Sequence, residues 1–305
     1  MVFINSLKFF KSNWLKVLKF LLYYIVIWGI CFALFLPVFF EFKGLVSENF
    51  SAAGVKFFGV FSGAIGANIQ NFFAAAIDTF FDVFRANIGM AIYGFLVVFV
   101  FLPFLINIGK YALSSTLYYY MTSNSESGFL SALVKSLKKS VVFALAKTFY
   151  NLVFFSLLGI AIYGLTTFGN TIYVRYCLWL VVFLAISLFF ALQQVTILGW
   201  IPALIVFDCN IFKAYQKGVK AAGRHLAKTF ATALAFFLIF WAFIMIFGAY
   251  VLALFVPLMA GLLCVYGMTQ FFTSQGMRFY INANKILTPK KLEEVDNINK
   301  TAFIL

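Results

Sequence analysis

The sequence predicts an all-α integral membrane protein with six transmembrane helices, two in-plane cytoplasmic amphipathic helices and a decayed parallel repeat. Of its 305 residues, 64% are hydrophobic and 10% are charged, whereas soluble domains carry about 25% charged residues. Apolar runs of roughly 20 residues recur along the chain, and each is long enough to cross a hydrocarbon core of about 30 Å. The sequence lacks the short alternating strands that are typical of a membrane β-barrel.

The N-terminal segment, residues 1–19, intersperses lysines with aromatic residues and is expected to lie at the membrane interface. The first span follows at residues 20–40. Its apolar run is too long for the core of a typical cleaved signal peptide, so we expect it to be retained. Residues 41–87 then form an outer segment, which opens with a polar turn at Glu41, Lys43, Glu48 and Lys56.

The remainder of this outer segment has helical periodicity, with Asp78, Asp82 and Arg85 on one face. Two structures fit this pattern. The segment is either an amphipathic helix on the outer surface or a re-entrant segment that lines a cavity. The sequence leaves both alternatives open.

Two units of similar organisation, residues 88–165 and 172–250, make up the centre of the chain. Each is predicted to contain an inward-running span, a basic amphipathic helix and an outward-running span. Pro103 is expected to kink the first inward span. The second is too long for one straight crossing, so it either bends at Gly199–Pro202 or projects into the cytoplasm. A last span and a cytoplasmic tail complete the chain, at residues 256–273 and 274–305.

The clearest periodic signal lies at residues 210–228, where an apolar stripe and a cationic stripe take opposite faces of one helix. The apolar stripe consists of Ile211, Tyr215, Val219, Ala222 and Leu226. The cationic stripe consists of Lys213, Lys217, Lys220, Arg224 and Lys228, and the matching helix of the first unit carries Lys135, Lys138 and Lys139. We expect these cations to bind anionic headgroups or a partner protein, and Asp208 or Asn210 to cap the helix start.

The distribution of cations orients the predicted spans. Nineteen of the 23 lysines and arginines fall in four segments on one side, and five of these lie within residues 110–147. The four cations of the outer segments are balanced by four acidic residues there. Because lysine and arginine accumulate in cytoplasmic loops, we expect a bacterial cytoplasmic (inner) membrane protein with both termini cytoplasmic.

The two units also share sequence. LAKTF occurs at residues 145–149 and again at 226–230, and Ala132, Lys135 and Lys138 align with Ala214, Lys217 and Lys220. The stretch GWIPALIVFD, followed by FKAYQKGVKAAGRHLAKTF, resembles the bacterial YesL-like family and is similar to the membrane domain of glycerophosphodiester phosphodiesterases. This resemblance covers roughly residues 88–275. It implies a fold type but no catalytic residues, and the chain contains no phosphodiesterase catalytic domain.

Catalysis is not expected. An enzyme needs a nucleophile, an acid/base pair or a metal site, and the nine acidic residues and single histidine form no such group. The four cysteines lack metal-ligand spacing, so no cofactor is expected either. The net charge of +14 is assigned to membrane topology rather than to nucleic-acid binding.

Two functional hypotheses follow. The first is a membrane scaffold or accessory subunit that contacts anionic lipid or another membrane protein complex. The alternative is a transporter, channel or lipid scramblase that uses the interface between the two repeats. Its candidate polar positions within the membrane are Gln193, Gln194, Asn151 and Gln270. The sequence reading identifies no intramembrane charges, which usually mark ion-coupled transport.

Overall fold

A computed structural model describes residues 2–52, 65–123, 128–168, 172–247, 252–274, 278–280 and 285–287. This part of the chain is helical, apart from a short antiparallel hairpin of β1 (Arg278–Tyr280) and β2 (Lys285–Leu287). Five helical stretches are long and apolar enough to cross a membrane, which indicates a multi-pass membrane protein. They are Trp14–Ala52, Ile88–Tyr119, Leu137–Ala161, Leu184–Phe207 and Val256–Ser274.

The N-terminal part consists of α1 (Val2–Ser12), α2 (Trp14–Ala52) and α3 (Ile65–Ala86). The predicted polar turn at Glu41, Lys43 and Glu48 is wrong, because α2 continues through all three residues, and Lys56 lies outside the described residues. The helix persists because its polar side chains find partners nearby. Asn49 Nδ2 donates to Asp82 Oδ2 of α3 at 3.1 Å, and Glu41 accepts a hydrogen bond from Asn87 at 3.2 Å.

The second long helix is disturbed just before Pro103, where a kink was predicted. It consists of α4 (Ile88–Phe95), the π-helix η1 (Leu96–Phe101) and α5 (Leu102–Ser123). Proline has no backbone N–H, and its ring excludes the carbonyl four residues earlier. The backbone adapts by widening, so that the Leu102 N–H bonds to the Val97 carbonyl, five residues back.

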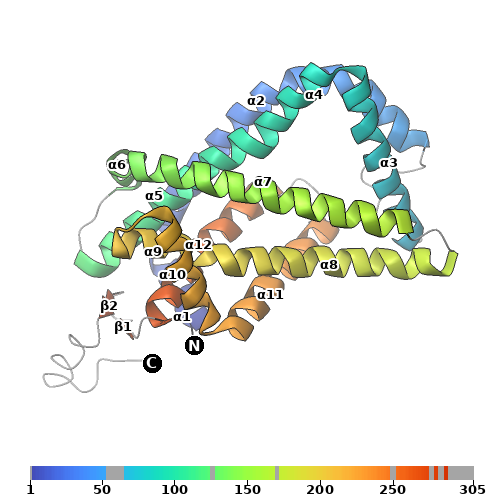
Figure 1. The fold of residues 1–305 in the computed structure, drawn as a ribbon. Coiled ribbons are helices and arrows are strands. Elements are labelled where there is room, and N and C mark those ends of the chain that lie inside the picture. Colours follow the sequence, from blue (N-terminus) through green and yellow to red (C-terminus); the bar gives the residue numbers. More distant parts are fainter. Residues whose placement is uncertain are drawn as a thin grey trace, which may run out of the picture.

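The following helices are α6 (Phe129–Lys135), α7 (Leu137–Phe168) and α8 (Ile172–Leu198). Figure 1 shows two diverging pairs of long helices: α2 runs beside α4 and α5, and α7 runs beside α8. Helix α3 bridges the far ends of the two pairs and contacts both α2 and α8. A surface-lying α3 and a re-entrant α3 both stay predictions.

The C-terminal helices are α9 (Trp200–Phe207), α10 (Ile211–Gly223), α11 (Leu226–Phe247) and α12 (Leu252–Ser274). The second inward span was predicted either to bend at Gly199–Pro202 or to project into the cytoplasm. In the structure its helix breaks at Gly199. Helix α11 is a sixth apolar helix, but its side chains are described only to Ile239.

The two copies of LAKTF do not occupy equivalent positions. In the first unit the chain breaks at Ser136, and Leu145 lies well inside α7. In the second unit the break comes at Arg224 and His225, and Leu226 begins α11. The repeat therefore stays a sequence-based prediction.

Two glycines determine how α10 packs. A Cβ atom added to Gly218 would lie 2.6 Å from the carbonyl carbon of Gly199, and one added to Gly199 would lie 2.7 Å from the carbonyl oxygen of Gly218. Both distances are far below van der Waals contact, so only glycine fits at either position. The Trp200 indole N–H reinforces the contact by donating to the Ile211 carbonyl at 3.1 Å. The backbones of α9 and α10 thus meet directly, as is common in membrane proteins.

We expect Gly218→Ala to lower the thermal unfolding midpoint of the detergent-solubilised protein, by the equivalent of about 1–3 kcal/mol for an overpacked contact. The new methyl group would meet backbone atoms, which cannot rotate away. Gly223→Ala, in the same helix, is the matched control, because a Cβ atom added to Gly223 would have no other atom within 4 Å. Equal losses in the two variants would contradict the Gly199–Gly218 contact.

Candidate functional site

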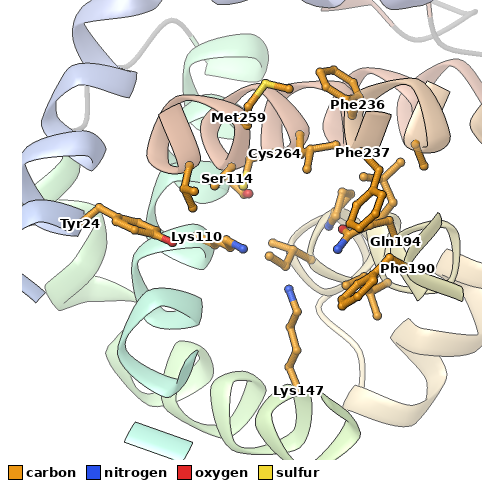
Figure 2. A pocket seen from close by; sticks show the side chains of 18 residues that line it. Tyr24, Lys110, Ser114, Lys147, Phe190, Gln194, Phe236, Phe237, Met259 and Cys264 are labelled. Atoms are coloured by element: carbon orange, nitrogen blue, oxygen red, sulfur yellow. The ribbon is translucent and has the colours of Figure 1, made fainter. Parts of the chain in front are cut away.

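A cavity of about 390 Å³ lies among seven helices near the middle of the structure (Figure 2). Its walls come from α2, α5, α7, α8, α9, α11 and α12. Most of the wall is apolar, with Phe190, Phe236, Phe237 and Met259 among the larger side chains. We call it the central cavity.

Two lysines point into the central cavity from different helices. Figure 2 shows the ammonium groups of Lys110, on α5, and Lys147, on α7, directed toward the same open space. Lys147 is only 7% exposed. Each lies inside a candidate membrane span, Ile88–Tyr119 or Leu137–Ala161.

The two lysines occupy comparable positions along their helices. At 1.5 Å per helical residue, Lys110 is about 14 Å before the end of its candidate span and Lys147 is about 15 Å after the start of its own. The chain leaves α5 and begins α7 at the same end of the molecule (Figure 1).

Among the residues that the structure describes, no carboxylate lines the central cavity. In the described part of the chain, the ion pairs are Arg85–Asp82 and Lys139–Asp208, and neither includes Lys110 or Lys147. The Lys147 ammonium instead lies 5.8 Å from the centre of the Phe143 ring, a cation–π contact. Unpaired charges are costly in a low-dielectric interior, so the two lysines favour an anion between them.

Other polar groups supplement the lysines. Gln194 of α8 approaches the open space opposite Lys110 in Figure 2, and Ser114 lies one helical turn beyond Lys110 on α5. The remaining wall is almost entirely hydrocarbon. A cluster of cations and donors within an apolar chamber suits a ligand with an anionic head and an apolar body.

The four polar positions predicted to lie within the membrane are found at three separate sites in the structure. Gln193 Nε2 donates to Asn151 Oδ1 at 3.0 Å, which links α8 to α7. Gln270 of α12 donates to the Thr229 hydroxyl of α11. Gln194 alone lines the central cavity. Interhelical hydrogen bonding therefore accounts for three of the four positions.

The predicted cationic residues are all exposed: Lys135, Lys138, Lys139, Lys213, Lys217, Lys220, Arg224 and Lys228. Three of them have partners within the chain. Lys139 pairs with Asp208, the Lys217 ammonium lies 3.8 Å from the Phe207 ring centre, and Arg224 donates to the Ser274 carbonyl.

The buried face of α10 is displaced from the predicted stripe. Leu226, which was placed on that stripe, is 54% exposed and belongs to α11. The buried residues are smaller, because the close approach to α9 excludes larger side chains; they are Ala214, Gly218, Ala221 and Ala222. This face packs against the protein.

The capping residues also differ from expectation. Asn210 occupies the N-cap position of α10, but its side chain makes no capping hydrogen bond. Asp208 ends α9 instead, in the left-handed conformation with φ of 45°. Its backbone N–H bonds to the Leu204 carbonyl, and its carboxylate pairs with Lys139.

Sequence reasoning missed Lys110 and Lys147, which it counted among cytoplasmic cations, and it found no intramembrane charge. The structure corrects both points. Their isolation in the sequence could have revealed them. No charged residue lies between Arg85 and Lys110, and Lys147 is followed by none until Arg175. The exposed lysines of α6 and α10 occur in clusters instead.

No protein-family model, curated protein or solved structure matches this chain. The resemblance of residues 88–275 to the YesL-like family therefore stays a prediction. The functional argument rests on the geometry of the central cavity.

We expect Lys110→Met and Lys147→Met each to raise the unfolding midpoint in the absence of added anions, by the equivalent of about 1–2 kcal/mol. Methionine keeps most of the side-chain length but removes an uncompensated buried charge. Thermal unfolding in an uncharged detergent measures the effect. Lys138→Met, at an exposed position of α7, serves as the control. Destabilisation by both cavity variants would contradict this account.

A double-mutant cycle tests the Gln193–Asn151 bond. Gln193→Leu and Asn151→Leu should each destabilise the protein, with a coupling of about 0.6–2 kcal/mol that the double variant recovers. Gln194→Leu, one residue along, lines the cavity and should leave the unfolding midpoint nearly unchanged. Strictly additive losses at residues 193 and 151 would argue against the bond.

Proposed function

We propose that this chain is a non-enzymatic multi-pass protein of the bacterial cytoplasmic membrane that binds and transports an anionic amphiphile. The observation that carries the proposal is the pair of ammonium groups of Lys110 and Lys147 directed into an apolar cavity, with no carboxylate among the described residues that line it. Ionisable residues inside a membrane span usually mark a substrate or ion pathway.

The ligand's two chemical parts would bind to different walls. An anionic headgroup, such as a phosphate, would lie between the two lysines and accept further hydrogen bonds from Gln194 and Ser114. Apolar chains would pack on aromatic and aliphatic side chains of α8, α11 and α12. The bound anion would neutralise two charges that otherwise repel each other in a low-dielectric setting.

The proposed topology has six spans with both termini cytoplasmic, and α11 supplies the sixth. Its apolar character over Leu226–Ile239 supports this assignment. Helices α6 and α10 would then lie on the cytoplasmic side, and the clustered lysines of both helices agree with that orientation.

A scaffold or accessory role is the second candidate. It is supported by the exposed Lys213, Lys217 and Lys220, which lie on α10 outside its buried Gly and Ala face. Such a face would attract anionic headgroups or an acidic partner. This role is compatible with transport, because the exposed cations and the central cavity share no residue.

Binding of dioctanoyl phosphatidic acid to the purified full-length protein tests the proposal by calorimetry. Lys110→Met or Lys147→Met should each weaken binding about tenfold or more, as expected for loss of a charged hydrogen bond. Lys43→Met, exposed on α2 and outside the central cavity, should have no such effect. Dioctanoylglycerol, which has no phosphate, should bind poorly to every variant.

Transport is then measured as movement of a fluorescent short-chain anionic lipid across proteoliposome membranes. Movement should exceed that in protein-free liposomes and be lost in the Lys110→Met/Lys147→Met double variant. Equal affinity in wild-type and cavity variants would refute the binding site. Movement that matches protein-free liposomes would refute transport and favour the scaffold role.

A further inference from the structure

A second pocket, of about 340 Å³, lies where α1, α11 and α12 meet, and we call it the outer pocket. The name refers to its exposed residues and not to the outer segment at residues 41–87. Most of the pocket's lining residues carry a polar group, but most of the lining surface is hydrocarbon, and none of the described residues that line it is a carboxylate. Lys228 and His225 are exposed, while Gln270 and Thr229 are buried. The outer pocket therefore offers a cation to a ligand that approaches from the protein surface.

Hydrogen bonds hold the buried side of the outer pocket in place. Gln270 of α12 donates to the Thr229 hydroxyl, and Tyr266 makes side-chain hydrogen bonds with Thr229 and Thr232 of α11. The three threonine hydroxyls of the pocket already donate to backbone carbonyls, so the exposed Lys228 ammonium is the group that would bind a phosphate.

The outer pocket and the central cavity lie along the same seam between α11 and α12. On α11, Lys228 and Thr232 line the outer pocket, and Phe236, one turn further, lines the central cavity. On α12, Tyr266 lines the outer pocket and Cys264 lines the central cavity. The two spaces are therefore consecutive along the seam.

Three aromatic rings separate the two spaces. The centre of the Phe3 ring is 5.8 Å from that of Phe236 and 6.5 Å from that of Tyr266, and the Phe236 and Tyr266 rings are 6.4 Å apart. Phe236 and Tyr266 are buried, whereas Phe3 is 40% exposed. We call these residues the aromatic triad. Each of its members comes from a different helix.

Helix α1, which supplies Phe3, is attached separately from the long helices. A break at Asn13 divides it from α2. Among its contacts with α12 is a hydrogen bond between the hydroxyl groups of Ser6 and Thr269, whose oxygen atoms are 2.6 Å apart. Helix α1 packs along α12, but the Phe3 ring is 40% exposed, so rotation of this one side chain would remove it from the aromatic triad.

We propose that the outer pocket binds the phosphate headgroup of the transported amphiphile, and that the aromatic triad closes this site from the central cavity until Phe3 moves. This inference rests on the proposed function of the central cavity. It adds a second binding site and identifies the Phe3 side chain as the moving element.

Labelling of Cys264 tests the closure without any ligand. In the full-length protein with the other cysteines replaced by alanine, an anionic methanethiosulfonate reagent should modify Cys264 slowly. Phe3→Ala should accelerate modification about tenfold, because it deletes both Phe3 ring contacts. Phe212→Ala is the matched control, since Phe212 is an exposed phenylalanine of α10.

A second reporter excludes general loosening of the protein. Cys31, buried in α2, is kept in place of Cys264 in a parallel variant, and Phe3→Ala should leave its labelling rate unchanged. An unchanged rate at Cys264 would overturn the closure. Equal acceleration at Cys264 and Cys31 would overturn it as well.

Binding at the outer pocket is measured in the Lys110→Met/Lys147→Met background, where the central cavity lacks its cations. Residual binding of dioctanoyl phosphatidic acid should weaken at least about fivefold in Lys228→Gln, as expected for loss of a charged contact. It should be unaffected by Lys43→Gln, an exposed lysine of α2 outside both pockets. Insensitivity to Lys228→Gln would overturn the outer site even if the central cavity binds as proposed.

Competition identifies the source of the phosphate. Inorganic phosphate should displace the lipid only at concentrations far above those of the lipid itself, because it lacks the acyl chains. Displacement by inorganic phosphate at equal concentration would overturn the assignment to a lipid headgroup.

Discussion

The direct backbone contact between Gly199 and Gly218 is the constraint on which much of the C-terminal half depends. It ends α8, sets the start of α9 and holds α10 against both. Gly267 of α12 approaches the same segment from another side, where an added Cβ would lie 2.8 Å from the Leu198 carbonyl oxygen. Close approach at glycine lets helices associate when apolar side chains alone give no preference over lipid. The wall of the central cavity at Leu198 and Ile201 is therefore positioned by backbone contacts.

Lys110 and Lys147 oppose the stability that this close packing provides. Close packing favours stability, whereas two uncompensated ammonium groups in an apolar chamber oppose it. Residues that lower the stability of a protein are commonly retained because its function needs them. Lys147 is supported along its stem, since Phe143 packs against Trp200 with ring centres 5.4 Å apart. The aromatic support orients the ammonium group toward the cavity, but it does not supply the negative charge that would neutralise it.

The sequence was sufficient for features that depend on local rules. Long apolar runs predict helices, Pro103 must disturb its helix, and Gly199–Pro202 marks a break in an overlong span. The sequence was insufficient where contacts between distant segments determine the local structure. The run from Glu41 to Glu48 is helical because α3 and Asn87 satisfy polar groups of α2. The buried face of α10 is shifted because Gly199, at the start of the preceding helix α9, leaves room only for a glycine at position 218. Periodicity also cannot distinguish a lysine that faces a cavity from one that faces headgroups.

The distribution of charge gives the two sets of lysines different roles. The lysines of α6 and α10 are clustered and exposed, which is the pattern that orients spans and attracts anionic surfaces. Lys110 and Lys147 are solitary and line a cavity, where Lys147 is buried and Lys110 is half-buried, and an orientation signal requires neither property. Helices α11 and α12 line both spaces: on α11, Phe236 lines the central cavity and Lys228 lines the outer pocket. Under the proposed function, the exposed cations attract the headgroup, Lys228 binds it first, and the paired lysines hold it within the membrane. The aromatic triad lies between the last two steps, at the position where a closed barrier would keep the lysine pair from surface anions that lack an apolar body.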